Sequence, residues 1–241
     1  MMAELARNYL TSAGLAVEGL TVGHGPSMIV DPTTLEESAQ HVADAVRRRL
    51  AGPRTEPVVA VIIAAIGDPG REQLAAELDV PVVGIGQASI LMAANGGRRF
   101  GMATSTPLLV DSLTCLVEEH GRSERFTGVR LTASDPVVLA ASAEQQYLEL
   151  ATAVRACVEQ DGAETVIIAG GPLSQTARRL AALDLVQIVE PVPSASKLVI
   201  DALGGSDARS PAPPEPQIVV WQEACATALD WACPCRSDER T

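Results

Sequence analysis

The longest apolar run in the chain extends from Val58 to Ile66 and is rich in β-branched residues. Such a run is typical of a parallel strand that is covered on both faces of its sheet. The residues after it have turn character: Gly67 frees the backbone, Asp68 can cap the next helix through its carboxylate, and Pro69 suits a first helical position. The pattern therefore predicts a buried strand that passes through a tight turn into a helix.

The same pattern recurs in the second half of the chain, where Val166–Gly170 repeats Val61–Ala65. Two copies of a strand-turn-helix unit predict two similar α/β lobes with parallel sheets. In such sheets the carboxyl ends of the strands and the helix N-termini face the ligand crevice. We therefore expect residues 65–68 and 170–173 to border one shared cleft.

Three consecutive hydroxyl residues, Thr104, Ser105 and Thr106, follow another predicted strand and precede Pro107. Thr106 is placed to cap a helix that begins at the proline. Hydroxyls and free N–H groups at such a helix start can bind a carboxylate or an imide oxygen. Capping accounts for Thr106 alone, so Thr104 and Ser105 remain candidates for ligand contact.

Three titratable side chains at predicted turns are the candidates for acid or base catalysis. Asp68 follows the first buried strand. Glu190 ends a later strand, where its carboxylate is a base, a hydrogen-bond acceptor for a ligand, or a solvated residue. His24 lies between two glycines, where it either reaches a ligand or has no part in binding. The residues alone leave these alternatives open.

The composition limits the class of partner. The chain has 241 residues, a formal net charge of −12 and only 2% aromatic residues. An acidic protein gains no counterion release on a phosphate backbone, and few aromatic side chains are available to stack on bases. We therefore expect a small-molecule ligand and neither a nucleic-acid nor a membrane partner. A homo-oligomer is left open.

The cysteines and the apolar runs bear on location and metal binding. No apolar run is long enough to span a bilayer, and the first residues lack the features of a secretion signal. Five cysteines without a regular framework fit a reducing compartment, so we expect a cytoplasmic protein. Cys225, Cys233 and Cys235 cluster, but no nearby histidine completes a zinc-ligand spacing. We expect no metal and no cofactor.

Together with the duplicated unit, several short motifs make the chain similar to the aspartate/glutamate/hydantoin racemase superfamily, and in particular to its hydantoin and allantoin racemase branch. The resemblance extends over roughly residues 2–203. The segment at the first buried strand is fairly specific, and the other motifs are weak alone. The motifs are Gly23–Pro26, Ile63–Gly70, Pro81–Gly86, Thr104–Pro107 and Ile168–Leu173.

The resemblance implies two pseudo-symmetric, doubly wound lobes of the flavodoxin-like kind, with a small acid or cyclic ureide between them. Members of this superfamily move a proton on a carbon beside a carbonyl without a cofactor, using two opposed thiols. The matching positions here are Ala65 and Gly170, and neither carries a proton. By this resemblance we expect ligand contacts from Ala65, Ile66, Gly67, Thr104, Ser105, Thr106, Gly170, Gly171, Pro172 and Leu173.

A second departure concerns the start of the first lobe. The superfamily pattern opens with a buried strand, whereas this chain begins at the helix that should follow it. Either Gln217–Trp221 fills the central position of the sheet, or the natural chain starts further upstream. We assign residues 1–98 and about 204–241 to the first lobe, with a linker at Ser206–Pro216, and residues 99–203 to the second.

Three hypotheses about function follow. The chain is an isomerase that transfers a proton beside a carbonyl with groups other than thiols, for which Asp68, Glu190 and His24 are available. Alternatively, it is a lyase or hydrolase whose glycine-rich turns stabilise an enolate or oxyanion. The third hypothesis is a binding protein that has kept the fold and lost the reaction.

Overall fold

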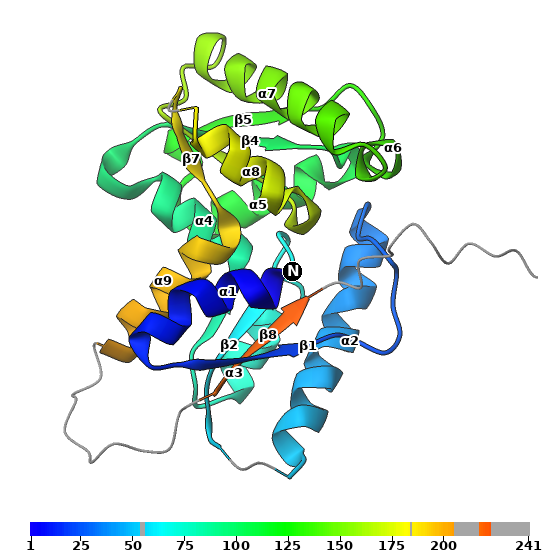
Figure 1. Cartoon of the computed structure of the whole chain (residues 1–241), viewed down its shortest axis with the longest axis vertical. Helices are drawn as coiled ribbons and strands as arrows, with labels where there is room; N and C mark the ends of the chain where they lie inside the picture. The colour runs from blue at the N-terminus through cyan, green and yellow to red at the C-terminus, as the bar shows by residue number, and fades with distance from the viewer. Residues whose placement is uncertain (54–55, 184, 205–216, 223–241) are drawn as a thin grey trace, which may run out of the picture.

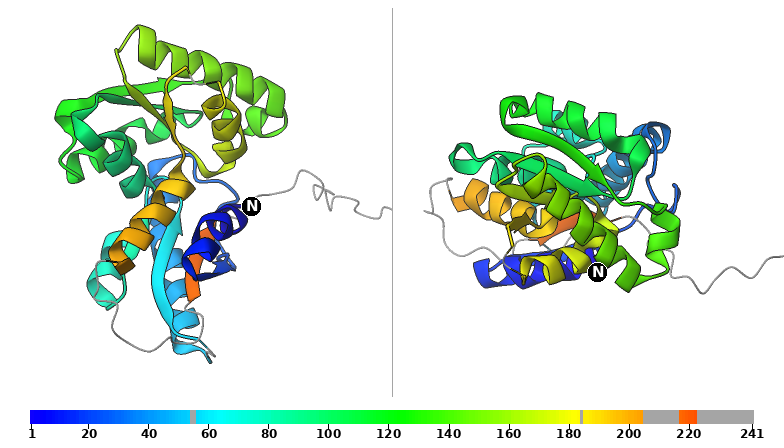
Figure 2. Two further views of the ribbon diagram at one scale, coloured as in Figure 1. Left: turned by 60° about the vertical axis from the view of Figure 1, so that its left-hand side comes forward. Right: turned by 90° about the horizontal axis from the view of Figure 1, so that it is seen from above.

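The computed structural model describes residues 1–53, 56–183, 185–204 and 217–222. Within these residues the chain forms two four-stranded parallel sheets, one in each of two lobes that lie along the long axis of the molecule (Figure 1). Two further views show helices packed around both sheets (Figure 2). The predicted α/β fold with two parallel-sheet lobes is confirmed. The predicted linker and the three clustered cysteines lie outside the described residues.

The first sheet consists, in spatial order, of β1 (Ala16–Leu20), β8 (Gln217–Gln222), β2 (Val58–Ala64) and β3 (Val82–Gly84). Its helices are α1 (Met2–Leu10), α2 (Pro32–Ala51), α3 (Arg71–Glu77) and α4 (Ile85–Ala93). Neighbouring residues of β2 face opposite sides, because Ile62 packs with α1 and α4 whereas Val61 and Ile63 pack with α2 and α3. Both faces of β2 are therefore covered, which explains its uninterrupted apolar sequence.

The last described strand fills the gap that the sequence predicts in this sheet. β8 lies between β1 and β2 and is parallel to both, with Val220 opposite Gly19 on one side and Ile62 on the other. The expectation that Gln217–Trp221 takes the central position is therefore confirmed. A strand from the end of the chain thus joins two strands that would otherwise each expose an unpaired edge.

The second sheet consists, in spatial order, of β5 (Phe126–Leu131), β4 (Phe100–Thr104), β6 (Thr165–Ile168) and β7 (Gln187–Val189). Its helices are α5 (Val110–Glu119), α6 (Pro136–Ala140), α7 (Ala143–Glu159) and α8 (Ser174–Ala181). Val166 and Ile168 pack with α7 and α8, whereas Ile167 faces a core shared with α4 and α5. The described residues also form five short 3-10 helices: η1 (Thr11–Ala13), η2 (Asn95–Gly97), η3 (Pro107–Leu109), η4 (Ser123–Arg125) and η5 (Gly171–Leu173).

The last helix, α9 (Pro191–Gly204), carries the chain back from the second lobe to the first. It packs mainly against α1 and α4, and Val192, Ala195 and Val199 belong to the same core as Ile62 of β2. The predicted second lobe included this helix, whereas its contacts place it with the first sheet. One continuous apolar core therefore connects the two lobes.

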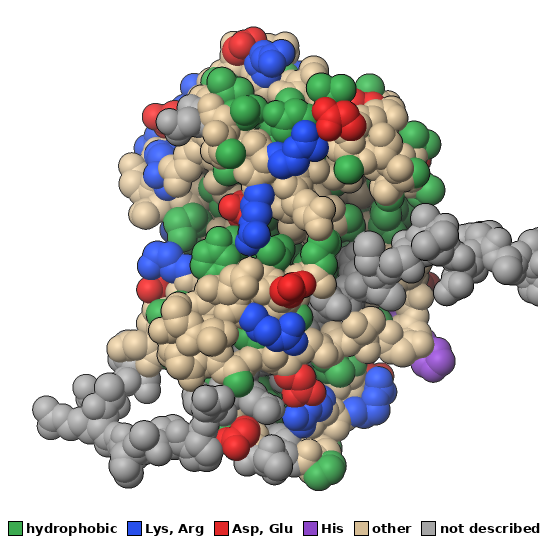
Figure 3. All heavy atoms as spheres, in the orientation of Figure 1, with side chains coloured by type: hydrophobic (Ala, Val, Ile, Leu, Met, Phe, Trp, Pro, Cys, Tyr) green, Lys and Arg blue, Asp and Glu red, His purple; other side chains and the backbone are tan. Residues whose placement is uncertain are grey.

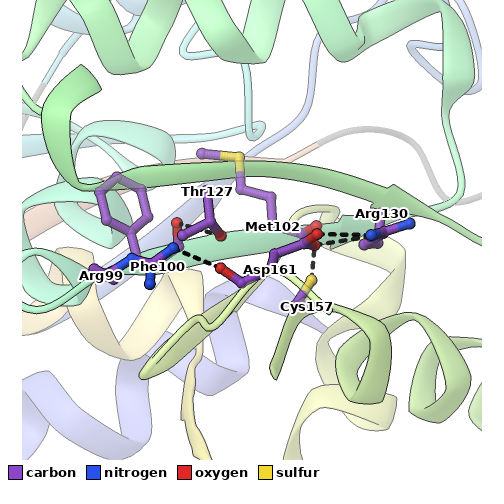
Figure 4. A network of polar contacts seen from close by, with 7 residues as sticks. All are labelled: Arg99, Phe100, Met102, Thr127, Arg130, Cys157 and Asp161. Carbon is purple, nitrogen blue, oxygen red and sulfur yellow. Dashed lines mark hydrogen bonds and ion pairs between the residues drawn. The ribbon is translucent and has the colours of Figure 1, made fainter. Parts of the chain in front are cut away.

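A polar network secures the outer end of α7 to the edge of the second sheet (Figure 4). The Arg130 guanidinium on β5 donates to both carboxylate oxygens of Asp161, at 2.8 and 2.6 Å, and Arg99 donates to the Asp161 carbonyl. The buried Cys157 thiol contacts the Met102 carbonyl, and burial raises its pKa to about 11. This cysteine is therefore a packed structural group.

The surface carries basic and acidic side chains side by side. On the face shown in Figure 3, Lys and Arg side chains are interspersed with Asp and Glu side chains rather than gathered into one basic patch. Among the described residues, no helix has the length and apolarity needed to cross a membrane. The absence of a nucleic-acid partner stays a prediction.

Candidate functional site

A cleft lies between the two lobes, where the turns after β2, β4 and β6 converge. The space between its walls is about 580 Å³, a figure that includes space open to solvent. Parallel strands place such turns at one edge of their sheet, which is where ligands bind in α/β folds. The lining residues are Met28, Ile29, Leu35, Ala65, Ile66, Gly67, Ser105, Thr106, Leu109, Pro136, Ala140, Gln146, Ala169, Gly170, Gly171, Pro172 and Leu173.

Both duplicated turns line this cleft, as the repeat predicts. Residues 65–67 contribute from the first lobe and residues 169–173 from the second, together with Ser105 and Thr106 from the turn after β4. The predicted shared cleft is therefore confirmed for these segments. Three other predicted lining residues, Asp68, Thr104 and Glu190, do not line it.

Asp68 fixes the first turn instead of facing the cleft. Its carboxylate is buried and accepts hydrogen bonds from the backbone N–H groups of Gly86, at 2.8 Å, and Gln87, at 2.6 Å. These donors belong to the first turn of α4, so Asp68 caps that helix. The expectation that Asp68 caps the immediately following helix is wrong, because α3 begins only at Arg71, after Gly70.

Close backbone contacts surround the Asp68 carboxylate. A Cβ atom on Gly84 would lie 2.0 Å from Asp68 Cγ, and one on Gly86 would lie 2.2 Å from the Ile66 carbonyl oxygen. Asp68 itself has a left-handed backbone with a φ of 49°. Glycine at both positions therefore lets the turn that lines the cleft rest directly on the start of α4.

Burial raises the pKa of the Asp68 carboxyl to about 7, although the two N–H donors oppose this shift. A carboxyl with such a pKa is suited to proton transfer near neutral pH. Its oxygens, however, are bonded to α4, and the residue does not line the cleft. The geometry therefore gives Asp68 a role in holding the turn and provides no support for its assignment as an acid or base.

The three hydroxyl residues after β4 have three different surroundings. The buried Thr104 hydroxyl donates to the Ala169 carbonyl at 2.6 Å and lies 3.0 Å from the Thr106 hydroxyl. Thr104 thus ties β4 to the turn after β6 and does not contact the cleft, contrary to expectation. The predicted cap by Thr106 is also wrong, because its side chain makes no capping bond to η3.

Ser105 is the hydroxyl of this segment that faces the cleft with unused bonding capacity. Its side chain lines the cleft and is 7% exposed. Within the described part of the chain, its hydroxyl has no hydrogen-bond partner. It can therefore donate to or accept from a ligand.

The second duplicated turn places Gly170 in the same lining as Ala65. The Leu173 side chain occupies the space beside Gly170, since a Cβ atom on Gly170 would lie 3.0 Å from Leu173 Cδ1. Ala65 is 2% exposed and presents only a methyl group. Ala65 and Gly170 therefore both border the cleft, and neither residue can hold a proton on a side chain.

Gln146 is a lining residue that the sequence reasoning missed. It lies in the first turn of α7, behind the Ser142 cap, and only 8% of it is exposed. Its side-chain oxygen accepts a 2.5 Å hydrogen bond from Thr176 on α8. The sequence does carry one signal of this burial. Gln146 lies on the same helix face as Leu150, Ala153 and Cys157, where it is the polar residue in an otherwise apolar stripe.

Glu190 and His24 lie outside the cleft. Glu190 follows β7, where burial raises its pKa and the Arg178 guanidinium, 3.5 Å away, opposes that shift. It borders a separate surface groove with Tyr9 and Lys197. His24 is exposed and does not line the cleft. The structure therefore does not bring the three predicted catalytic residues together.

The described lining carries no ionisable side chain. Its polar side chains are Ser105, Thr106 and Gln146, and the remainder of the lining is apolar or glycine. No three His, Cys, Asp or Glu side chains of the described residues are grouped to hold a metal ion. The described residues of the cleft can thus bind polar atoms through hydrogen bonds but offer no side chain that exchanges a proton readily.

Comparison with known proteins places this arrangement in a family. The family model described as Asp/Glu/Hydantoin racemase matches residues 1–199. The chain belongs to the Asp/Glu/hydantoin racemase family. Hydantoin racemase of Paenarthrobacter aurescens is 24% identical over 193 residues, which cover 80% of each chain. Allantoin racemase from Pseudomonas fluorescens has a similar structure, with a TM-score of 0.74, 23% identity, and coverage of 89% of this chain and 92% of that chain.

A more distant solved structure shares the racemase-family fold. A double mutant of arylmalonate decarboxylase, in a liganded form, has a TM-score of 0.52 and 15% identity to this chain. The similarity covers 81% of this chain and 96% of the decarboxylase. At such low identity it supports a common fold only.

Proposed function

We propose that this racemase-family chain binds a small cyclic ureide, amino-acid derivative or carboxylate in the cleft between its lobes, and that it does not invert a carbon centre with two thiols. The observation that carries the proposal is the composition of the cleft. The two duplicated turns border it, yet Ala65 and Gly170 occupy the positions that match the paired cysteines.

The chemistry of racemisation explains why this observation matters. A proton on a carbon beside a carbonyl is weakly acidic, so inversion needs a base on one face and an acid on the other, each within hydrogen-bond reach. Neither Ala65 nor Gly170 can serve. The predicted alternatives, Asp68, Glu190 and His24, do not line the cleft. Ligand binding without two-thiol racemisation is therefore the function that the geometry supports best.

A lyase is the second candidate, and one feature of the cleft favours it. Much of the lining is apolar, including Leu35, Leu109 and Leu173, and an apolar wall disfavours a localised carboxylate charge more than neutral carbon dioxide and a carbanion whose charge is delocalised onto a neighbouring carbonyl. The related arylmalonate decarboxylase fold shows that a decarboxylase is built on this architecture. Loss of carbon dioxide also needs no base to remove a proton from carbon, and the carbanion that it leaves takes its proton from water in the open part of the cleft.

Incubation in heavy water distinguishes these functions. A methyl-substituted hydantoin, allantoin, an N-carbamoyl amino acid and an aryl malonate are each added to the full chain, and binding is measured by calorimetry. Proton NMR follows deuterium uptake at carbon and the conversion of the aryl malonate into its decarboxylated product. We expect saturable binding of at least one compound with exchange no faster than in buffer. Rapid exchange would contradict the proposal, and so would the absence of all binding.

A further inference from the structure

Gln146 differs from every other polar side chain in the described lining because it is both buried and held by a neighbour. Thr176 on α8 donates to its side-chain oxygen, and Thr176 itself is only 3% exposed. This bond fixes the plane of the carboxamide. The amide nitrogen, with two N–H donors, has no partner among the described residues.

The cleft around Gln146 therefore offers hydrogen bonds of a particular kind. The amide nitrogen donates, the side-chain oxygen keeps a second lone pair, and the Ser105 hydroxyl can do either. A ureide or imide edge, where a ring N–H stands beside a carbonyl, presents both a donor and an acceptor. A carboxylate presents acceptors only. The pair Gln146 and Ser105 thus matches the ureide edge better than the carboxylate.

Charge favours the same choice. The described lining contains no Lys, Arg or His side chain. A carboxylate that leaves water for a largely apolar cleft loses its hydration, and no cation of the described lining offsets that loss. An uncharged ring loses much less hydration free energy when it enters the same cleft. The uncharged lining therefore favours an uncharged ring over a carboxylate, as the hydrogen-bonding groups of Gln146 and Ser105 also do.

We infer that Gln146, oriented by Thr176, is a specificity-determining residue that selects an uncharged ligand with an amide edge, such as a cyclic ureide, over a carboxylate. The inference rests on the proposed binding function and narrows its ligand class. In this arrangement Gln146 contacts the ligand, whereas Thr176 acts through Gln146 as a positioning residue.

Hydantoin and its ring-opened form, N-carbamoylglycine, are the matched probes, because ring opening converts a neutral imide into a carboxylate. Calorimetry on the full chain should show hydantoin binding about tenfold more tightly. Gln146→Met, which keeps the side-chain length and removes the hydrogen bonds, should weaken hydantoin about tenfold and N-carbamoylglycine much less. Thr176→Val should weaken hydantoin by a smaller factor.

The chain offers a matched control in Gln145, which is exposed on the same helix and bonds to Ser134 and Glu149. Gln145→Met should leave both affinities within twofold of the wild type. Equal hydantoin binding by the wild type and Gln146→Met would overturn the inference and leave the proposed function intact. Binding of neither probe by the wild type would overturn the inference, and the proposed function would fall with it only if none of the four compounds named for it bound either.

A ligand-side measurement makes the test independent of any variant's folding. Hydantoin methylated on both ring nitrogens keeps its carbonyls and its lack of charge but loses both N–H donors. The wild type should bind it about tenfold more weakly than hydantoin. Equal affinities for these two compounds, or tighter binding of N-carbamoylglycine than of hydantoin, would overturn the inference.

Discussion

The two turns that line the cleft come from one sequence repeat but are held in different ways. The first turn rests on α4 through the buried Asp68 carboxylate and through the close approach of Gly86 to the Ile66 carbonyl. The second turn has no buried carboxylate. Thr104 donates to the Ala169 carbonyl, and Ser174 donates to the Gly171 carbonyl at 2.7 Å.

This difference shows what the repeat specifies. It places two strands and two turns at equivalent positions, but the contacts that fix each turn come from elements outside the repeated unit. The first turn is constrained by backbone atoms, which cannot move aside. The second is bounded partly by flexible side chains, since a Cβ atom on Gly171 would meet Met2 Sδ at 2.9 Å. The two sides of the cleft should therefore respond differently to substitution.

The largest effect is expected from restoring a thiol on both sides, with Ala65→Cys and Gly170→Cys together. If the two turns oppose each other across a ligand, this double variant gains a base and an acid on opposite faces of the reacting carbon. General acid-base catalysis contributes about 10² or more in rate, so deuterium uptake by a bound hydantoin should rise at least about 100-fold. Proton NMR in heavy water measures this uptake.

Each single cysteine variant is the control for that experiment, because one thiol alone cannot serve both faces. The backbone at Gly170 is extended, with a φ of 167°, and accepts any residue. The Leu173 side chain must move slightly to admit the new Cβ atom. A folded double variant that binds hydantoin without any gain in exchange would show that the two turns do not address opposite faces of the ligand.

The second prediction compares one glycine from each side. Gly86→Ala should lower the free energy of unfolding by about 3 kcal/mol or more, because the new methyl group would collide with a backbone carbonyl. Gly171→Ala should cost about 1 kcal/mol, since the Met2 side chain can move. Urea unfolding of both variants measures the difference. Equal losses would show that the first turn is no more constrained than the second.

Asp68→Asn tests the carboxylate that only the first turn has. Asparagine can accept one of the two N–H bonds, and its own amide nitrogen would face the other donor. At pH 5 we expect a loss of about 1–3 kcal/mol in unfolding free energy. Ligand affinity should fall only as far as the turn loosens, because Asp68 does not line the cleft.

The pH dependence gives a second measure of the same residue. The folded-state pKa of Asp68 is raised to about 7 from an ordinary value of 3.8, so the folded protein binds a proton that the unfolded chain releases. This contribution to stability is complete below about pH 4 and is lost as the pH rises to 7, by at most about 1.4 kcal/mol per pH unit. Asp68→Asn should therefore show a shallower fall over this range. Parallel curves would contradict the raised pKa.

Local patterns predicted the framework of the molecule well. Three strands could be predicted because a buried parallel strand needs a continuous apolar sequence. They are β2, its copy β6 and the strand that fills the first sheet. The positions of Ala65 and Gly170 at the cleft followed from the same repeat. Each of these features is determined by residues that lie within the strand concerned or within a few positions of it.

The failures concern side chains whose partners lie far along the chain. Asp68 bonds to α4, beyond an intervening helix and strand, so no local rule indicates its direction. Thr104 turns inward to the carbonyl of Ala169 for the same kind of reason. Gln146 escaped notice because its burial depends on how α7 packs against α8. The chemistry of the cleft therefore depends on tertiary contacts that one sequence does not reveal.

The smallest effect is expected from the native cysteines. Neither Cys115, on the exposed side of α5, nor the buried Cys157 lines the cleft, and Cys225, Cys233 and Cys235 lie outside the described residues. Replacing all five by alanine should leave hydantoin affinity and any proton exchange within about twofold, provided that the variant folds.

Alkylation of the wild-type protein is the parallel measurement, in which Cys157 should react slowly because burial raises its pKa to about 11. The full-length chain is used in both cases, so that the three cysteines near its end are tested along with the two described ones. Loss of an exchange activity on alkylation, traced to one cysteine by single replacements, would show that a thiol from outside the duplicated turns reaches the ligand. That result would place a catalytic thiol away from the two turns that carry Ala65 and Gly170, and it would contradict the proposal that the chain does not use a thiol for proton transfer.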